Sequence, residues 1–399
     1  MLLASSPMSR GLPRSSGALF FAALTLTGLT VFFGGGSTYT PLVWIGGVAV
    51  MMAGAVLALG LFGRLPIAAL DGAGRAFVGL LAAFVLWNGA SIAWSVAPDR
   101  SWEYFNRGLV YLAFAVLGLI VGAVVPRAPR AVALGLMAVF AVALLWALAG
   151  KVVPNLYPDG ERIARLRAPL GYWNALALLA LMTLVLALWA AVRREHARAL
   201  RLSGVLIVFA AAVSLLLTYS RGGVVVALLG LGVFLVVSRD RVEAIAALCV
   251  SLPAAVVLGA WAFTQPGIVG DGQPYDRRLA DGLQLGAGLL LAGGLVAVLA
   301  YLGLKHEKRW RPRISTRVSG PRLAAFSAVV LLVGVLAVSR GDPVGWARDG
   351  FREFTSPTSQ AGAGPERFRN FNLNSRWLLE FPELSAVLPR EISLTEDTC

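Results

Sequence analysis

Apolar stretches of about 20 residues recur along nearly the whole chain, separated by short segments that carry charges, glycine or proline. A helix needs about 20 apolar residues to cross the hydrocarbon core of a bilayer. The shorter stretches are also expected to be helical, because backbone groups in lipid must be hydrogen-bonded within the protein. The sequence therefore predicts an all-α polytopic membrane protein with about 11 transmembrane helices. The predicted spans are residues 17–33, 41–62, 76–96, 108–125, 131–150, 172–192, 203–219, 222–238, 244–263, 284–304 and 323–339.

The composition excludes two other classes of protein. Hydrophobic residues make up 58% of the 399 residues and charged residues 14%, against about 25% charged in average globular chains. So much apolar surface is incompatible with a soluble enzyme and with a disordered chain. The two cysteines, Cys249 and Cys399, are too few for a disulfide framework. A net charge of +14 would indicate nucleic acid binding in a soluble protein, but here we expect the lipid bilayer as partner and no nucleic acid.

Basic residues predict the orientation of the spans, since cytoplasmic loops of membrane proteins are enriched in Lys and Arg. With the N-terminus in the cytoplasm, the inner segments hold 19 basic residues, the outer loops hold 9 and the segment after the last span holds 7. The opposite orientation would place the most basic loop, 305–322, outside. We therefore expect a cytoplasmic N-terminus at 1–16, a membrane domain at 17–339 and an external tail at 340–399. The first span is expected to stay uncleaved, because no small-residue cleavage motif follows it.

The interior of the spans does not favour ion-coupled transport. No predicted span carries Asp, Glu, Lys or Arg deep inside, whereas transporters driven by protons or sodium usually carry intramembrane carboxylates. Many of the 44 glycines lie within spans, as in the run from Gly118 to Gly122. We predict that these glycines allow close helix packing, since no phosphate-binding loop motif is present.

Two segments expected on the outer face carry the candidate site. Residues 151–174 contain four cations and two carboxylates, and Arg221 stands alone between two apolar runs. A lone arginine in so short an apolar turn favours an anionic ligand, with contact to lipid headgroups as the alternative. Gly222 and Gly223 would let a ligand approach the backbone closely, beside the N-terminal amides of a helix.

These segments resemble the two paired motifs of the O-antigen ligase and O-antigen polymerase family. One is Arg167-Ala-Pro-Leu-Gly-Tyr-Trp-Asn174, and the other is Thr218-Tyr-Ser-Arg221-Gly222. One complete span, a basic inner loop and a further span separate them, as in the family. In addition, Asn374-Ser-Arg376-Trp377 resembles the start of the family's large external loop.

The resemblance implies a multi-span glycosyltransferase. Family enzymes transfer a glycan from a polyprenyl-pyrophosphate carrier to a hydroxyl acceptor on the outer face of the plasma membrane, without a nucleotide sugar or a required metal cofactor. It implies that Arg167 and Arg221 are catalytic and stabilise the leaving diphosphate, since a guanidinium pairs bidentately with phosphate and stays charged. The substrate-binding residues that it implies are Arg165, Asn174, Ser220, Gly222 and Arg376. For Asn174 and Ser220, helix capping is an equally good interpretation.

The resemblance is incomplete toward the C-terminus. The family's external loop carries a histidine thought to act as general base, followed by at least one more span. Here the two histidines, His196 and His306, fall in basic loops expected inside, where we predict that they are solvated. No apolar span follows Trp377, so we expect a truncated or frame-shifted chain, whose activity in this form the resemblance leaves open. The carboxylates Asp349, Glu353 and Glu366 are predicted to be solvated loop residues rather than substitute bases.

Three other functions fit parts of the pattern. Cell-wall glycan polymerases also use lipid-pyrophosphate donors, but they depend on an external acidic residue in a large loop. A transporter or flippase of an anionic lipid-linked precursor would use the outer arginines for binding alone and would usually show internal repeats, which inspection of the sequence does not reveal. A membrane scaffold without a ligand leaves Arg221 unexplained. Ligase and polymerase share both motifs, so the acceptor stays open. The Ala-, Arg- and Gly-rich composition suggests a GC-rich bacterial genome, and the resemblance then implies a multi-pass protein of the bacterial plasma membrane.

Overall fold

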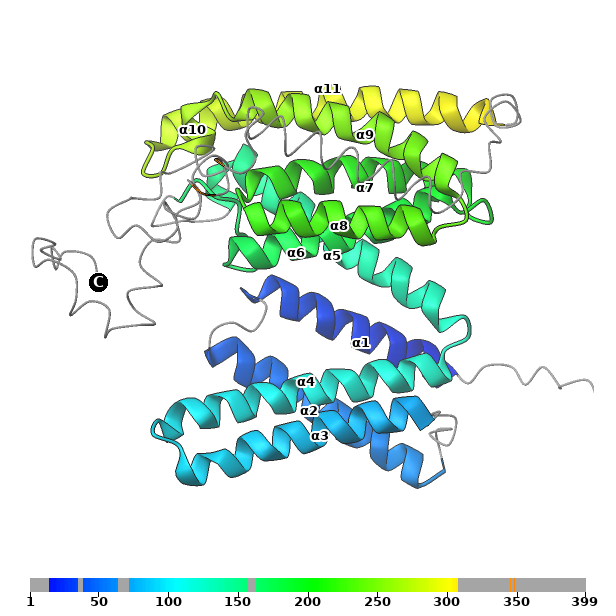
Figure 1. The fold of residues 1–399 in the computed structure, drawn as a ribbon, viewed down its shortest axis with the longest axis vertical. Helices are drawn as coiled ribbons and strands as arrows, with labels where there is room; N and C mark the ends of the chain where they lie inside the picture. The colour runs from blue at the N-terminus through cyan, green and yellow to red at the C-terminus, as the bar shows by residue number, and fades with distance from the viewer. Residues whose placement is uncertain are drawn as a thin grey trace, which may run out of the picture.

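The structure is a computed structural model that describes residues 14–34, 39–63, 72–156, 163–307, 345 and 348. Within these ranges the chain is helical and contains no strand, which confirms the all-α class (Figure 1). Short 3-10 turns lie at Ile92–Trp94 and Pro154–Leu156. The helices are α1 (Arg14–Phe32), α2 (Tyr39–Leu61), α3 (Gly72–Ser91), α4 (Pro98–Val124), α5 (Ala128–Val152), α6 (Trp173–Val192), α7 (Arg198–Leu217), α8 (Arg221–Val237), α9 (Arg241–Ala262), α10 (Pro266–Val269) and α11 (Tyr275–Lys305).

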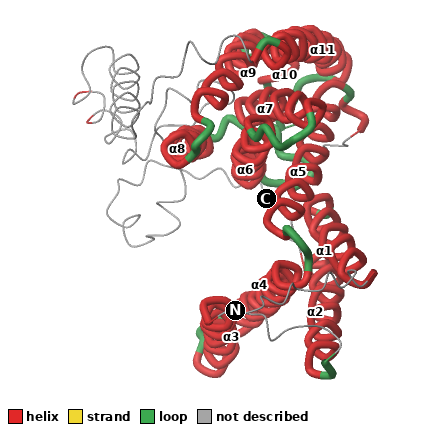
Figure 2. The backbone as a smooth tube through the Cα atoms, turned by 90° about the vertical axis from the view of Figure 1, so that its right-hand side faces the viewer, coloured by secondary structure: helices red, strands yellow, loops and turns green. Residues whose placement is uncertain are grey.

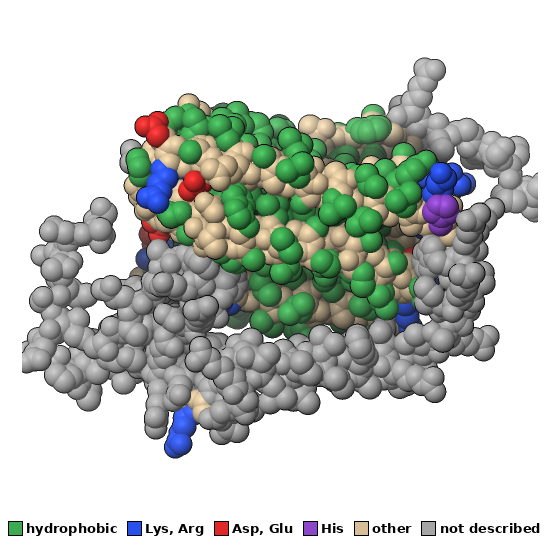
Figure 3. Space-filling view, turned by 90° about the horizontal axis from the view of Figure 1, so that it is seen from above, with side chains coloured by type: hydrophobic (Ala, Val, Ile, Leu, Met, Phe, Trp, Pro, Cys, Tyr) green, Lys and Arg blue, Asp and Glu red, His purple; other side chains and the backbone are tan. Residues whose placement is uncertain are grey.

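Eight helices of the described part are long and apolar enough to cross a membrane, and α1 and α8 are shorter apolar helices. The predicted spans between residues 17 and 304 each coincide with one of these helices, while the last predicted span, 323–339, lies outside the described residues. Figure 3 shows hydrophobic side chains over much of one face of the molecule, with charged side chains toward its two ends. On α11, Leu290 and Leu291 are 80% and 76% exposed. Apolar side chains exposed in this way are stable in lipid and unfavourable in water, so the chain is a multi-pass membrane protein.

Two helices begin well before the apolar runs that predicted them. α4 starts at Pro98, ahead of the predicted span 108–125, and α11 starts at Tyr275, ahead of the predicted span 284–304. The first turns of α4 are polar, and Arg107 pairs there with Glu103 four residues earlier, a spacing that stabilises a helix surface. Such polar turns extend a helix beyond its apolar run, so a criterion based on apolar runs misses them.

The helices form two groups, which are distinguished most easily in Figure 1 and which meet where α1 packs against α5 (Figure 2). The first group comprises α1 to α4, and a small core joins α1, α2 and α4. The second group comprises α5 to α11, and α6 and α7 lie at its centre. In the apolar stretches of α6 and α7, 67% and 61% of the residues are buried, whereas in α3, at the edge of the first group, 6% are buried. The two motifs of the predicted site belong to this second group.

Glycine allows the close approach of α6 and α7. A Cβ added at Gly204 of α7 would lie 2.7 Å from the carbonyl oxygen of Ala187 and 2.8 Å from the amide nitrogen of Ala191, so a larger residue would push the helices apart. The same prediction for the run in α4 is wrong. A Cβ at Gly118 or Gly122 would meet nothing within 4 Å, because these positions face open space in the described structure.

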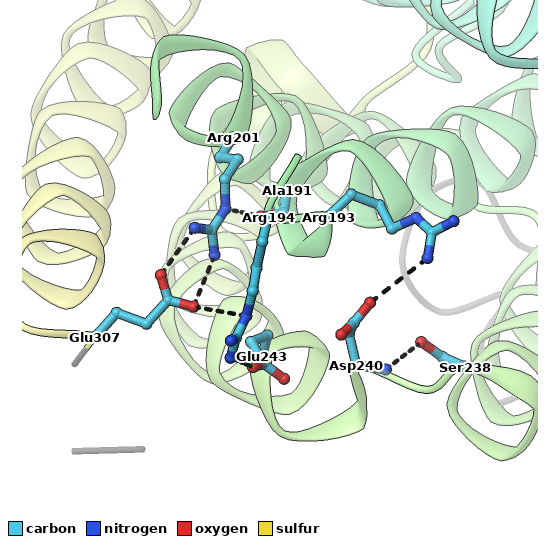
Figure 4. Close-up of polar contacts among 8 residues, drawn as sticks. All are labelled: Ala191, Arg193, Arg194, Arg201, Ser238, Asp240, Glu243 and Glu307. Carbon is cyan, nitrogen blue, oxygen red and sulfur yellow. Dashed lines mark hydrogen bonds and ion pairs between the residues drawn. The ribbon is translucent and has the colours of Figure 1, made fainter. Parts of the chain in front are cut away.

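Four charged side chains form an ionic cluster where α6 and α11 end and α7 and α9 begin (Figure 4). Arg201 donates to both carboxylate oxygens of Glu307, at 2.8 and 3.2 Å, and through Nε to the carbonyl oxygen of Ala191 at 2.9 Å. Arg194 donates to Glu243 at 2.7 Å, and its Nε lies 3.6 Å from Glu307. The side chains of Arg201 and Glu243 are 8% and 6% exposed and that of Arg194 is 41% exposed, so the ionic cluster is a partly buried connection between the ends of four helices.

His196 is buried, so the prediction that it is a solvated loop residue is wrong. It is 4% exposed, its Nδ1 lies 2.9 Å from the carbonyl oxygen of Ala190, and its ring packs edge-on against Trp189. The short connection between α6 and α7 folds the imidazole back onto the end of α6. His306 is exposed, as predicted.

Candidate functional site

A non-helical loop precedes α6 and carries Arg165 and Arg167, the second of which begins the first motif. Its backbone lies along the end of α7, because the amide of Leu166 donates to the carbonyl oxygen of Leu217 at 2.9 Å. Arg165, which is half-buried, donates through Nε and Nη2 to the carbonyl oxygens of Thr218 and Tyr219, at 3.0 and 3.2 Å. Arg165 therefore ties the loop that leads into the first motif to the α7–α8 turn of the second motif.

The guanidinium of Arg165 also stacks on an aromatic ring. Its central carbon lies 4.0 Å from the centroid of the Trp173 ring, at the first position of α6, within the range of a cation–π contact. The structure thus gives Arg165 a role in joining the loop, the turn and α6, besides the predicted contact with substrate.

The turn between α7 and α8 is tight and buried. Thr218, Tyr219 and Ser220 are 0%, 1% and 4% exposed. Tyr219 has a φ of 52°, a left-handed conformation that is uncommon for a bulky side chain. The Oγ of Ser220 accepts a hydrogen bond from the amide of Gly223 at 3.1 Å, so Ser220 is the N-cap of α8, as the capping interpretation predicted.

A side-chain hydrogen bond joins the two motifs directly. Ser220 donates through Oγ to Oδ1 of Asn174 at 2.8 Å, and Nδ2 of Asn174 donates to the hydroxyl of Tyr172 at 2.6 Å. Asn174 is the second residue of α6, where Tyr172 is the N-cap position and makes no side-chain capping bond. The capping interpretation therefore holds for Ser220, while Asn174 links α6 to the turn before α8.

The two arginines predicted to be catalytic lie at the same end of the helix bundle. Arg167 is half-buried in the loop, and its carbonyl oxygen accepts from the amide of Gly171, which turns the chain into α6 with a φ of 76°. Arg221 is half-buried at the first position of α8, directly after the N-cap. The contacts of Arg165 and Leu166 hold the segments that carry these two arginines side by side.

The two glycines after Arg221 differ in their surroundings. Gly222 is exposed, and a Cβ there would meet nothing within 4 Å, so the surface beside Arg221 is open. A Cβ at Gly223 would lie 2.6 Å from the Cβ of Ala177, so Gly223 allows α8 to pack on α6. The remaining predicted substrate residue, Arg376, lies outside the described residues.

A third segment, the connection between α10 and α11, reaches the site, and sequence reasoning missed it. Asp271 accepts a hydrogen bond through Oδ1 from the amide of Ala164 at 2.6 Å. Burial raises the pKa of the Tyr219 phenol, the Asp271 carboxylate raises it further and the Arg165 guanidinium lowers it. The charges of Asp271 and Arg165 therefore both act at the α7–α8 turn, and Tyr219 keeps its proton at neutral pH. The only signal in the sequence is the Asp271-Gly272 pair, which is a turn dipeptide. It indicates a turn, but it does not indicate which segment the turn contacts.

The arrangement suits an anionic ligand. Two half-buried arginines and the N-terminus of α8 lie at one end of the bundle, and helix N-termini favour negative charge. Among the described residues, no group of three or more His, Cys, Asp or Glu side chains is placed to hold a metal ion.

No protein-family model, curated protein or solved structure matches the chain.

Proposed function

We propose that the chain is a membrane glycosyltransferase similar to the O-antigen ligases and polymerases, which takes a glycan from a polyprenyl-pyrophosphate donor and transfers it to a hydroxyl acceptor. The observation that carries the proposal is the joining of the two motifs. Ser220 bonds Asn174 at 2.8 Å and Leu166 bonds Leu217 at 2.9 Å. Two segments that the resemblance pairs by residue type alone are thus neighbours in space.

In the proposed reaction, the acceptor hydroxyl attacks the anomeric carbon of the donor sugar, and the proton that it loses passes to solvent water. The bond between that carbon and the pyrophosphate oxygen breaks, so negative charge grows on the departing diphosphate. Arg167 and Arg221 stabilise this charge, because a guanidinium binds phosphate oxygens through two parallel hydrogen bonds. Fixed cations that meet developing charge in a partly buried site lower the barrier to the reaction. Gly222 leaves room beside Arg221 for the diphosphate.

We further propose that this end of the bundle faces the outside of a bacterial plasma membrane, with the N-terminus in the cytoplasm and about 11 spans in all. At the opposite end, the connection between α6 and α7 holds Arg193 and Arg194, α7 begins at Arg198 and α9 begins at Arg241. Clusters of Arg at one end of the bundle are typical of the cytoplasmic side. Cysteine accessibility in intact cells, at introduced cysteines replacing Gly222 and His306, tests the orientation.

Binding of farnesyl pyrophosphate to the full chain in lipid nanodiscs tests the roles of the arginines. Arg167→Ala and Arg221→Ala are each expected to weaken binding by about 10- to 100-fold, as loss of hydrogen bonds to a charged group implies. Arg277→Ala is the matched control, because Arg277 is an exposed arginine in the first turn of α11, and it should bind as the unchanged chain does. Unchanged binding by both motif variants would refute the assigned roles.

A second assay separates transfer from transport. Proteoliposomes loaded with a lipid-linked glycan donor and an acceptor should form a new glycosidic bond if the chain is a transferase. Movement of the donor across the bilayer without a new bond would instead favour the flippase.

A further inference from the structure

The loop that carries Arg165 and Arg167 is held from two sides. On one side, its backbone and Arg165 bond the end of α7 and the α7–α8 turn. On the other side, the amide of Ala164, one residue before Arg165, donates to Asp271 at 2.6 Å. Asp271 lies 107 residues further along the chain, and it is exposed, so it is not required to fill the core.

The segment that presents Asp271 is itself fixed to the helices. The amide of Gly267 in α10 donates to Asp281 of α11 at 2.7 Å, and Nζ of Lys151 at the end of α5 donates to the carbonyl oxygen of Ile268 at 3.1 Å. α11 touches the end of α5 so closely that a Cβ at Gly282 would lie 2.5 Å from the carbonyl oxygen of Lys151. A hydrogen bond to Asp271 therefore attaches the arginine loop to a rigid support.

We propose that Asp271 is a positioning residue, which holds the loop so that Arg167 is ready for a phosphate-bearing ligand. The identity of the ligand, a polyprenyl pyrophosphate, rests on the proposed function above. A loop without regular structure must otherwise be ordered when the ligand binds, and that ordering weakens affinity. Because Asp271 fixes the amide next to Arg165, part of the loop is already ordered before the ligand binds, and the loss of conformational entropy on binding is smaller.

A carboxylate is well suited to this task. A hydrogen bond from a backbone amide to an ionised carboxylate is shorter and stronger than one to a neutral acceptor, in keeping with the 2.6 Å between Ala164 and Asp271. An asparagine at the same position would keep an acceptor oxygen and lose the charge. The pair of variants therefore separates the hydrogen bond from the charge.

The test compares Asp271→Ala and Asp271→Asn in the full chain in nanodiscs, with Asp276→Ala as a control for an exposed carboxylate on the adjacent first turn of α11. Hydrogen–deuterium exchange measures how well the loop is held, and farnesyl pyrophosphate is the binding probe. Asp271→Ala should speed exchange at the Ala164 amide by about tenfold and weaken binding by a similar factor. Asp271→Asn should stay within about threefold of the unchanged chain in both measurements, and Asp276→Ala should match it.

Three results would overturn the proposal: unchanged exchange in Asp271→Ala, faster exchange without weaker binding, or an Asp271→Asn variant as impaired as the alanine variant. The last would mean that an acceptor oxygen at position 271 does not hold the loop. The exchange measurement needs no ligand. If the unchanged chain fails to bind the probe, the proposed function fails, while the tether is still judged by the exchange of the Ala164 amide.

Discussion

Removal of Arg201 from the ionic cluster should destabilise the fold more than removal of any exposed arginine. Arg201→Ala deletes the two hydrogen bonds to Glu307, at 2.8 and 3.2 Å, and the bond to the carbonyl oxygen of Ala191. Glu307 is only 15% exposed and would keep one ion pair, with Nε of Arg194 at 3.6 Å. The variant thus leaves a largely buried carboxylate with much weaker compensation.

The magnitude follows from the burial of the pair. Breaking a buried pair by removing one partner costs about 3–5 kcal/mol. We expect a value near the lower limit, about 3 kcal/mol, because Arg194 remains beside Glu307. The matched control is Arg193→Ala. Arg193 and Asp240 are 3.9 Å apart, with side chains 44% and 23% exposed, so this variant should cost less than about 1 kcal/mol.

Reversible unfolding in mixed detergent micelles, followed by circular dichroism, measures both variants. The double replacement Arg201→Met with Glu307→Leu should recover most of the lost stability, because it removes the buried charges together. If Arg201→Ala and Arg193→Ala differ by less than about 0.5 kcal/mol, burial does not govern the strength of these pairs and the reasoning is wrong.

Other variants test the turn between α7 and α8. Gly223→Ala should cost about 1–3 kcal/mol by overpacking, because the added Cβ would come within 2.6 Å of the Cβ of Ala177. Gly222→Ala should be neutral or slightly stabilising, because its site is open and alanine favours helix. Equal effects of the two variants in thermal melts would contradict the geometry. Ser220→Ala should lose about 1 kcal/mol through the missing N-cap, and full stability in the same melts would exclude that role. The raised pKa of Tyr219 predicts stability that is complete below about pH 10, the ordinary value for tyrosine, and that falls above it, because the unfolded phenol ionises first. Tyr219→Phe should flatten this alkaline loss, and an unchanged pH profile of stability would refute the assignment.

The helices between residues 14 and 305, apart from the four-residue α10, were predictable because one physical requirement sets them. Each needs an apolar run long enough for lipid, and such runs are visible in the sequence. The starts of α4 and α11 were not predictable in this way, since Pro98 and Tyr275 open polar turns. The roles of single glycines also escaped prediction. Gly204 and Gly118 look alike in sequence, and only the neighbouring helix decides that one is packed and the other open.

His196 shows a further limit of charge patterns. A basic loop at a helix end predicts solvated side chains, yet the connection between α6 and α7 is so short that the imidazole folds back onto Trp189. The ionic cluster also could not be predicted from the charge pattern. Arg201 lies in α7 among several nearby arginines, and its partner Glu307 lies 106 residues away in the sequence.

The candidate site, too, was predictable only in part. Residue type and order pick out the two motifs, because few side chains other than arginine meet a diphosphate with fixed charge. The contacts that hold the motifs together depend on distant segments: Arg165 reaches Thr218, and Asp271 reaches Ala164. The sequence pattern groups Arg165 with Arg167, but two donor groups of Arg165 are bonded to backbone carbonyls and its face lies against Trp173. An arginine engaged in this way is better suited to shape the loop than to follow a leaving group. The proposed chemistry therefore depends chiefly on Arg167 and Arg221, and Arg165→Lys should loosen the loop even though it preserves the charge.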